Sequence, residues 1–272
     1  MRRLLLLPGW AWLSLFVAAP VGILAAIALA TSREAVPPYQ LGLDWSSLAG
    51  LADPYYLHGL LGSLRIGAVT AIGCLLIGYP MALGIARARH GQVLLMLVIL
   101  PFWTGLLLRL TALIAIFRDE GMLNHALLSL GLITRPIAFL HSDFAMYVGL
   151  IYCYLPFMIL PLHARLAAAN PALEQAAADL GAPPWRVFAR IILPLSRPGI
   201  WAGLALVFVP VTGEYVIPEL LGSPASLTMG RVIWEEFFEN RDWPQSAALA
   251  LVLLALLLLP ALAFRRTGPR TI

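Results

Sequence analysis

The chain of 272 residues is 61% hydrophobic and only 12% charged, and its mean hydropathy is +0.86. Soluble globular domains have about 45–50% apolar residues, so this composition excludes an ordinary soluble domain and indicates an integral membrane protein. All 18 basic residues are arginines, and the net charge of +4 is therefore interpreted by position along the chain, not as a patch that binds nucleic acid.

Six long apolar stretches predict membrane-spanning helices, because a helix needs about 20 apolar residues to cross the hydrocarbon core. They lie near residues 10–30, 66–86, 93–117, 144–163, 199–218 and 244–264. The first stretch resembles a secretory signal, but its uncharged run from Leu4 to Ser32 is too long for one. We expect an uncleaved helix there and a single all-α membrane domain over residues 1–272.

The arginines predict the orientation of these spans. An even number of spans places both termini on one side, together with Arg2, Arg3, Arg87, Arg89, Arg165, Arg186, Arg190, Arg197, Arg265, Arg266 and Arg270. The opposite side holds Arg33, Arg118, Arg135, Arg231 and Arg241, while Arg65 and Arg109 lie in or at the edge of spans. By the positive-inside rule, both termini are expected in the cytoplasm.

Two segments on the outer side, residues 31–57 and 219–243, exceed simple hairpins. In the second, RVIWEEFFENRDW interleaves apolar side chains with Glu235, Glu236 and Glu239. This pattern predicts a helix lying along the membrane surface. A solvated loop helix is the alternative.

The stretch EQAAADLGAPPWRVFARIILPLSRPGI is much more polar than its surroundings and falls in the cytoplasmic loop 165–197. Asn170 can cap a helix that has Pro171 at its first position, and Gly181 can close that helix in the left-handed conformation. The alanines between them would leave a smooth surface that another protein can approach. A compact connector that binds no partner is the alternative.

A second short helix is expected in the same loop. The Pro183-Pro184 pair forces a turn, and the helix from Trp185 is expected to end at Pro194. Its large apolar side chains are expected to anchor it to the membrane domain; they are Trp185, Phe188, Ile191 and Ile192.

This loop resembles the coupling loop of permease subunits in binding-protein-dependent ABC importers, which reads E-A-A, three residues, G, and a distal I-x-L-P. Residues 191–194 match the distal part, whereas Gln175 stands where the family has its glutamate. The resemblance implies a type I permease fold and a loop, residues 171–194, that sits in a groove of the ATPase subunit. The coupling residues it implies are Glu174, Gln175, Ala176, Ala177, Asp179 and Gly181.

Further stretches narrow the resemblance. GEYVIPELLG, MGRVIWEEFFENRDWPQSAA, LPFWTGLLLR at 100–109 and YLPFMILPL at 154–162 are similar to the polyamine branch of these permeases, in particular to putrescine importer subunits. The resemblance implies an inner-membrane subunit that imports putrescine or spermidine. It also implies a second permease, two copies of an ATPase subunit and a periplasmic binding protein as partners. Another amine or small organic solute is the alternative cargo.

The sequence lacks the parts of an enzyme or of an ATPase. It has no lysine and no G-x-x-x-x-G-K loop for a nucleotide, no H-E-x-x-H and no G-x-S-x-G. We therefore expect a subunit with no catalytic residues, metal or cofactor, whose ATP is hydrolysed by another polypeptide. A stand-alone secondary transporter is a rival hypothesis, but internal repeats typical of that class are absent from the sequence.

Glu214 lies in the fifth span, where Pro210, Gly213 and Pro218 make a continuous helix doubtful. An acid at membrane depth is costly and usually faces a cavity or a partner. Broken helices are tolerated in membranes where they line a pathway. One hypothesis is therefore that Glu214 lines a pathway, and the other is that it forms an ion pair with Arg109.

The pathway hypothesis fits a cationic cargo. Aromatic rings bind ammonium groups, and the aromatic candidates are Tyr215, Trp103 and Tyr154. Eleven acids fall on the outer side and two on the inner side. An acid-rich outer mouth attracts cations, although outer loops can also tolerate acids passively.

Overall fold

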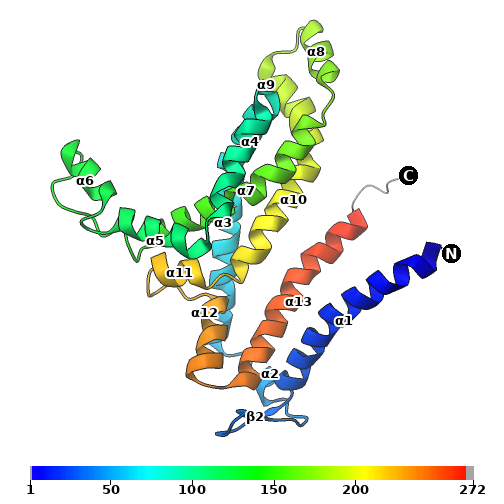
Figure 1. Cartoon of the computed structure of the whole chain (residues 1–272), viewed down its shortest axis with the longest axis vertical. Coiled ribbons are helices and arrows are strands. Elements are labelled where there is room, and N and C mark those ends of the chain that lie inside the picture. The colour runs from blue at the N-terminus through cyan, green and yellow to red at the C-terminus, as the bar shows by residue number, and fades with distance from the viewer. Residues whose placement is uncertain (1, 268–272) are drawn as a thin grey trace. The chain divides into compact units, whose positions relative to one another are not determined.

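The structure is a computed structural model that describes the backbone of residues 2–267 and the side chains of residues 8–258. Five arginines of the topology argument lie outside the described side chains; they are Arg2, Arg3, Arg265, Arg266 and Arg270. The regular secondary structure of the described residues is helical apart from one pair of short strands (Figure 1). Its contacts form two compact units, residues 1–63 with 227–272, and residues 64–226.

The first unit combines the two ends of the chain. Its elements are α1 (Arg2–Ala28), β1 (Thr31–Ser32), β2 (Tyr39–Gln40), α2 (Ser46–Gly50), the start of α3 (Pro54–Arg87), α12 (Met229–Trp234), the π-helix η3 (Glu235–Glu239) and α13 (Trp243–Thr267). Helices α1 and α13 pack together around the buried Ala28, Ala247 and Ala248, because small side chains let apolar helices approach closely. The antiparallel β1–β2 pair is a small exception to the predicted all-α fold.

The segment RVIWEEFFENRDW is helical, as predicted, over α12 and η3. Its acids do not all face solvent: Glu236 is buried and accepts hydrogen bonds from the Tyr56 hydroxyl (2.9 Å) and the Asn240 amide (3.0 Å). The Tyr55 hydroxyl donates to Glu235 (2.8 Å). The start of α3 therefore holds η3 through two tyrosines. A place along the membrane surface stays a prediction.

The second unit contains the rest of α3 and the middle of the chain. Its other elements are α4 (Gly91–Ile99), the 3-10 helix η1 (Leu100–Trp103), α5 (Leu106–Phe117), α6 (Met122–Ser129), α7 (Asp143–Ala167), α8 (Pro171–Asp179), α9 (Pro184–Val187), the π-helix η2 (Phe188–Ile192), α10 (Leu193–Thr212) and α11 (Val216–Leu221). Helices α8 and α9 lie at one end of α10, and α11 lies at the other (Figure 1).

Glycines bring α7 and α10 together at the centre of this unit. A Cβ atom at Gly203 would lie 2.5 Å from the Met158 sulfur, and one at Gly199 would lie 2.9 Å from the Pro161 carbonyl oxygen. Residues four apart share one face of a helix, so the two glycines form a flat strip against α7. Helices α7 and α10 thereby enclose the Met158 side chain, which is fully buried.

The predicted membrane-helix architecture is present. Four helices of the described region are long and apolar enough to cross a membrane: Pro8–Ala28, Pro54–Arg87, Asp143–Ala167 and Pro184–Thr212. A fifth candidate is the pair Gly91–Trp103 and Leu106–Ser129, which is bent by 91°, and Trp243–Leu258 is a shorter apolar helix. The count of six spans stays a prediction.

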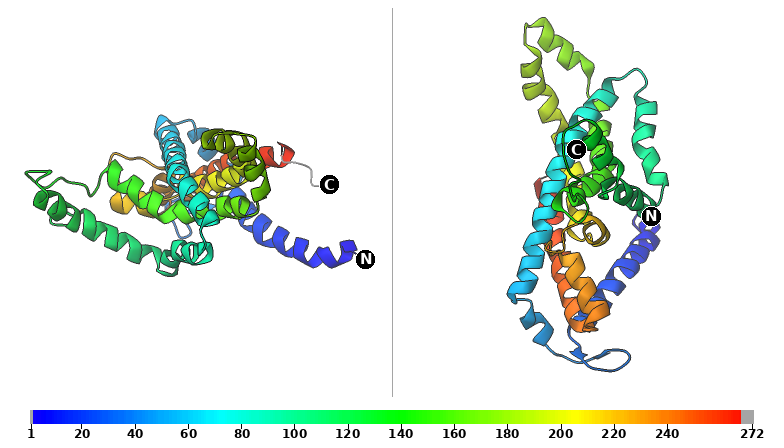
Figure 2. Two further views of the ribbon diagram at one scale, coloured as in Figure 1. Left: turned by 90° about the horizontal axis from the view of Figure 1, so that it is seen from above. Right: turned by 90° about the vertical axis from the view of Figure 1, so that its left-hand side faces the viewer.

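The bent pair interrupts the predicted third span, residues 93–117. Thr104 and Gly105 are extended there, with ψ angles of 139° and 148°. The Thr104 hydroxyl donates to the Pro101 carbonyl (2.6 Å), which gives a carbonyl at the end of η1 a partner outside the regular helical ladder. As a result, α5 and α6 turn away from α4 (Figure 2).

The second helix of the polar loop does not end at Pro194, so this prediction is wrong. One helix continues from Pro184 to Thr212 through α9, η2 and α10. The Leu193 N–H donates to the Phe188 carbonyl, five residues earlier, so a wide π turn directly precedes the proline. A regular α turn would press the proline ring against a carbonyl of the preceding turn, and we attribute the continuity to the wider turn.

The glycine strip generates the first prediction. Gly203→Val should lower the free energy of unfolding by about 1–3 kcal/mol, because the new side chain overpacks against Met158. Thermal unfolding of the purified subunit in detergent measures this change. Gly84→Val is the matched control, since Gly84 is also helical but has no atom within 4 Å of an added Cβ. Equal unfolding temperatures for both variants would contradict the packing argument.

Candidate functional site

The polar loop forms the predicted pair of helices at one end of α10. The Asn170 side chain accepts a hydrogen bond from the Ala172 N–H (3.0 Å), and Pro171 occupies the first position of α8. Gly181 has a φ of +77°, the left-handed conformation that glycine adopts without a steric penalty. The Ala182 N–H then reaches back to the Ala177 carbonyl (3.0 Å) and closes the helix. Local sequence signals therefore set both ends of α8.

The loop exposes large apolar side chains. Leu180 is 88% exposed and Trp185 is 67% exposed, so Trp185 does not anchor the second helix as predicted. Of the other predicted anchors, Ile192 is buried, Ile191 is half-buried and Phe188 is 36% exposed. Val187, which was not predicted, is also buried. Two residues along a helix turn the side chain by about 200°, which places Trp185 opposite the anchoring face that begins at Val187.

The predicted coupling residues divide between exposed and half-buried positions of α8. Gln175, Ala176 and Asp179 are exposed, whereas Glu174 and Ala177 are half-buried. The Glu174 carboxylate forms an ion pair with the guanidinium of Arg87 at the end of α3, 2.6 Å away. A polar cavity of about 280 Å³ lies beside this pair; Arg87, Arg165, Asn170, Glu174 and Ser196 are among the residues that line it.

Glu214 lies at a break between helices, as predicted. Helix α10 ends at Thr212 and α11 begins at Val216. The Glu214 carboxylate accepts hydrogen bonds from the Val216 N–H (3.0 Å) and from the hydroxyl of Tyr154 in α7. The first of these satisfies a backbone donor that the start of a helix leaves without a partner. Glu214 therefore caps the start of α11 and links the break between the helices to α7.

The hypothesis that Arg109 pairs with Glu214 is not reproduced in the described part of the structure. The Arg109 guanidinium carbon lies 5.1 Å from the centroid of the Phe102 ring, and its Nε atom is buried without a hydrogen-bond partner among the described residues. Trp103 is 90% exposed, and Tyr215 precedes α11. The structure thus brings Tyr154 to Glu214 and leaves Trp103 on the surface.

Two aromatic residues that the sequence analysis did not single out connect Arg109 with Glu214. The ring centroids of Phe102 and Phe157 are 5.0 Å apart, and those of Phe157 and Tyr154 are 5.8 Å apart. A row of contacts therefore runs from the guanidinium to the carboxylate. The signal that could have found both rings is the sequence Leu-Pro-Phe, which occurs at 100–102 and again at 155–157.

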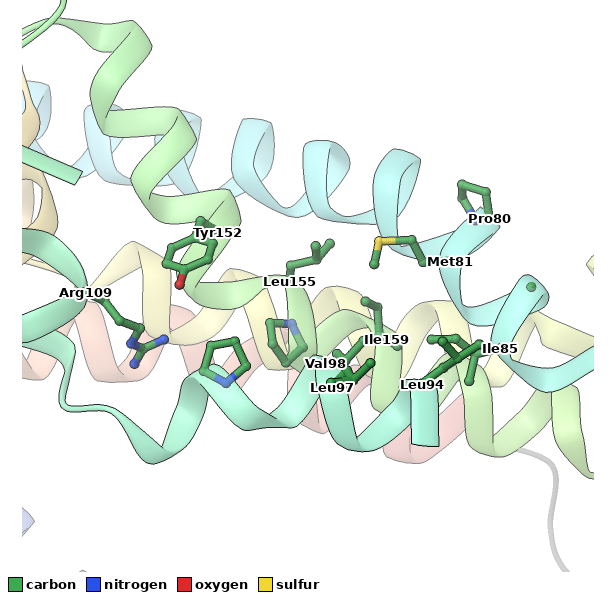
Figure 3. Close-up of a pocket in the computed structure, with 13 residues that line it drawn as sticks. Pro80, Met81, Ile85, Leu94, Leu97, Val98, Arg109, Tyr152, Leu155 and Ile159 are labelled. Carbon is green, nitrogen blue, oxygen red and sulfur yellow. The ribbon is translucent and has the colours of Figure 1, made fainter. Parts of the chain in front are cut away.

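A separate groove of about 530 Å³ lies along α3, α4 and α7. Figure 3 shows Arg109 and Tyr152 at one end of it and apolar side chains such as Leu97 and Ile159 along the rest. Moving an ammonium group onto apolar walls without a partner is costly. The groove is therefore unsuited to a polycation.

Comparisons with known proteins show the family to which the chain is related. The sequence model described as "Binding-protein-dependent transport system inner membrane component" matches residues 75–272. The spermidine/putrescine transport system permease protein PotB of Haemophilus influenzae is 37% identical over 254 residues, which cover 92% of this chain and 88% of that protein. PotB of Escherichia coli is 37% identical over 259 residues and 94% of each chain. The molybdenum transport system permease ModB of Mycobacterium bovis is 32% identical over 97% of this chain and 95% of its own.

Two solved structures share the fold. A bacterial ABC transporter involved in the import of alginate has a TM-score of 0.69 and 21% identity, covering 97% of this chain and 94% of that chain. The alginate transporter in complex with its pentasaccharide-bound periplasmic protein has a TM-score of 0.70 and 20% identity, covering 99% and 96%. The family match includes the loop at α8 and the break at Glu214, and the chain belongs to the family of inner membrane components of binding-protein-dependent transport systems.

Proposed function

We propose that this chain is a permease subunit of an ABC importer that carries polyamines, putrescine and spermidine, into the cytoplasm. The observation that carries the proposal is its 37% identity, over 92% and 94% of its length, to spermidine/putrescine permeases of two bacteria. The carboxylate of Glu214, held beside aromatic side chains at a helix break, is suited to a cationic cargo.

The pathway in this proposal begins at Glu214 and Tyr154. Their carboxylate and ring offer charge and a π face to an ammonium group, and Phe157 and Phe102 extend the aromatic row. The Phe102 ring already carries the Arg109 guanidinium, so a cargo ammonium group would bind at the Glu214, Tyr154 and Phe157 end of the row. Tyr215 and the exposed Trp103 are further candidates at the ends of the row.

Energy comes from another polypeptide in this proposal, because the chain has no nucleotide-binding loop. Residues 171–194 would dock into the ATPase subunit, of which two copies are expected. The exposed Leu180 and Trp185, together with the small side chain of Ala176, give this loop an apolar surface suited to a close protein contact.

The remaining partners and the topology follow from the same proposal. Six spans in the bacterial inner membrane would place both termini in the cytoplasm, with a second permease beside this one and a single domain over residues 1–272. A periplasmic binding protein would deliver the cargo. The structural neighbour that was solved with its pentasaccharide-bound periplasmic protein supports this last partner.

A second candidate is the same architecture with another cargo, an amine or a small organic solute. The likeness to a molybdenum permease, and to an alginate importer in fold, shows that this fold does not fix the cargo. The charge at Glu214 favours cations over molybdate or an acidic polysaccharide.

Uptake by the reconstituted complex tests the cargo directly. Proteoliposomes that hold this chain with its second permease and ATPase, supplied with the binding protein, should accumulate labelled putrescine and spermidine when ATP is present on the cytoplasmic side. Molybdate and alginate oligosaccharides should not enter. Import of either anion without polyamine uptake would replace the proposed cargo.

Gly181→Arg should uncouple ATP hydrolysis from transport. Nothing lies within 4 Å of an added Cβ at this position, so the change introduces charge and left-handed strain of about 1–2 kcal/mol without a clash. The ratio of cargo imported to ATP hydrolysed measures the coupling. Gly131→Arg is the matched control, because Gly131 is also left-handed (φ +67°) and equally open, in the loop after α6. Equal uncoupling by both variants would mean that strain, not docking, is responsible.

Glu214→Gln should reduce polyamine uptake by at least about tenfold, because a hydrogen bond to a charged group contributes about 1.5–3 kcal/mol. Assembly should be retained, because the amide oxygen can still accept from Val216. Uptake and the amount of membrane-inserted complex are measured side by side, with Glu120→Gln as the control at an exposed acid. Loss of assembly first, with rescue by Arg109→Gln in the same chain, would instead favour an ion pair between Arg109 and Glu214.

A further inference from the structure

The end of α3 contacts both halves of the polar loop. Arg87, the last residue of α3, forms its ion pair with Glu174 in α8. Two turns earlier, the hydroxyl of Tyr79 shares a hydrogen bond with the Ser196 hydroxyl of α10 (2.9 Å). The Tyr79 ring also meets the edge of Phe188 in η2, with centroids 5.7 Å apart. Helix α3 is thus tied to each helix of the loop by a separate contact.

The ion pair that joins Arg87 to α8 differs from the contacts that Tyr79 makes with α10 and η2. Helix α8 packs on α9 and η2, and the polar cavity separates part of it from α3. The side chains of Arg87 and Glu174 are 50% and 35% exposed. Exposed ion pairs add little to folding stability because water and salt screen them. Removing this pair should therefore leave the fold intact and change only how firmly α8 is held to α3.

We propose that Arg87 is a positioning residue that fastens the docking helix α8 to α3 through Glu174. This inference rests on the proposed docking of residues 171–194 to an ATPase subunit. A displacement of α8 by that subunit then reaches α3 through the ion pair and reaches α10 through the continuous helix from Pro184. Glu174, one of the two acids of the loop, is directed to Arg87 of its own chain, and Gln175 beside it is left exposed.

Measurements of cargo imported per ATP hydrolysed test the role of the ion pair between Arg87 and Glu174. Arg87→Ala and Glu174→Gln should each reduce cargo imported per ATP by at least about fivefold, the lower range of typical coupling between sites. The double variant should be no worse than either single variant, since both remove the same contact. Exchange of the charges, Arg87→Glu with Glu174→Arg, should restore a large part of the ratio. Arg89→Ala, an exposed arginine two residues on, is the matched control and should match the wild type.

Wild-type coupling in both single variants would overturn the proposal, as would an equal defect in Arg89→Ala. A readout that needs no cargo separates this outcome from an error in the proposed substrate. Spin labels are placed at the exposed Ala178 and His90, while the native Cys74 and Cys153 are buried. The distance between the labels is measured in the assembled complex with and without a non-hydrolysable ATP analogue.

In the wild type, the distribution of distances between the two labels should be narrow and should not change when nucleotide binds, because α8 and the end of α3 move together. Arg87→Ala should broaden this distribution of label distances, because α8 is then held less firmly to α3. A wild-type distance that changes with nucleotide, or an Arg87→Ala distribution as narrow as the wild type, overturns the proposal. A wild-type complex that hydrolyses ATP but imports no polyamine corrects the cargo alone, and the label distances still decide the role of Arg87.

Discussion

The close approach of α7 and α10 is the constraint on which the second unit depends. Gly199 and Gly203 let α10 come close to the backbone and to the Met158 side chain of α7, and this close packing replaces the hydrophobic driving force that lipid cannot supply. This approach brings Tyr154 of α7 to the Glu214 carboxylate. It also fixes the direction of α10, whose helix begins at Pro184 within the polar loop.

One helix therefore joins the two candidate sites. The 29 residues from Pro184 to Thr212 span about 43 Å at 1.5 Å per residue, with the loop at one end and the break at the other. A rigid helix transmits displacement along its length, whereas the break at Glu214 can absorb a change of angle. Helix α3 is tied to the same loop through Tyr79 and Arg87. In the proposed mechanism, movement of the loop would therefore act on two helices at once.

Features set by neighbouring residues were predictable from the sequence. Asn170 caps α8, Gly181 closes it and the helix breaks near Glu214, because each signal acts within a few residues. The passage of the helix through Pro194 was not predictable, since proline usually ends a helix and the π turn that accommodates it has no local signal in the sequence. The surroundings of Arg109 were also missed, because Arg109 and its ring partner Phe102 lie on opposite sides of a bend that shows in the sequence only as a proline and a glycine.

Cross-linking tests most directly whether the loop of residues 171–194 contacts the ATPase subunit. Leu180→Cys places a thiol at the 88% exposed position of the loop, and Leu130→Cys places one at a 71% exposed position after α6. In the assembled complex, a short bifunctional reagent should join Leu180→Cys to the ATPase subunit and leave Leu130→Cys unlinked. A cross-link from Leu130→Cys, or none from Leu180→Cys in a complex that still transports, would contradict the account.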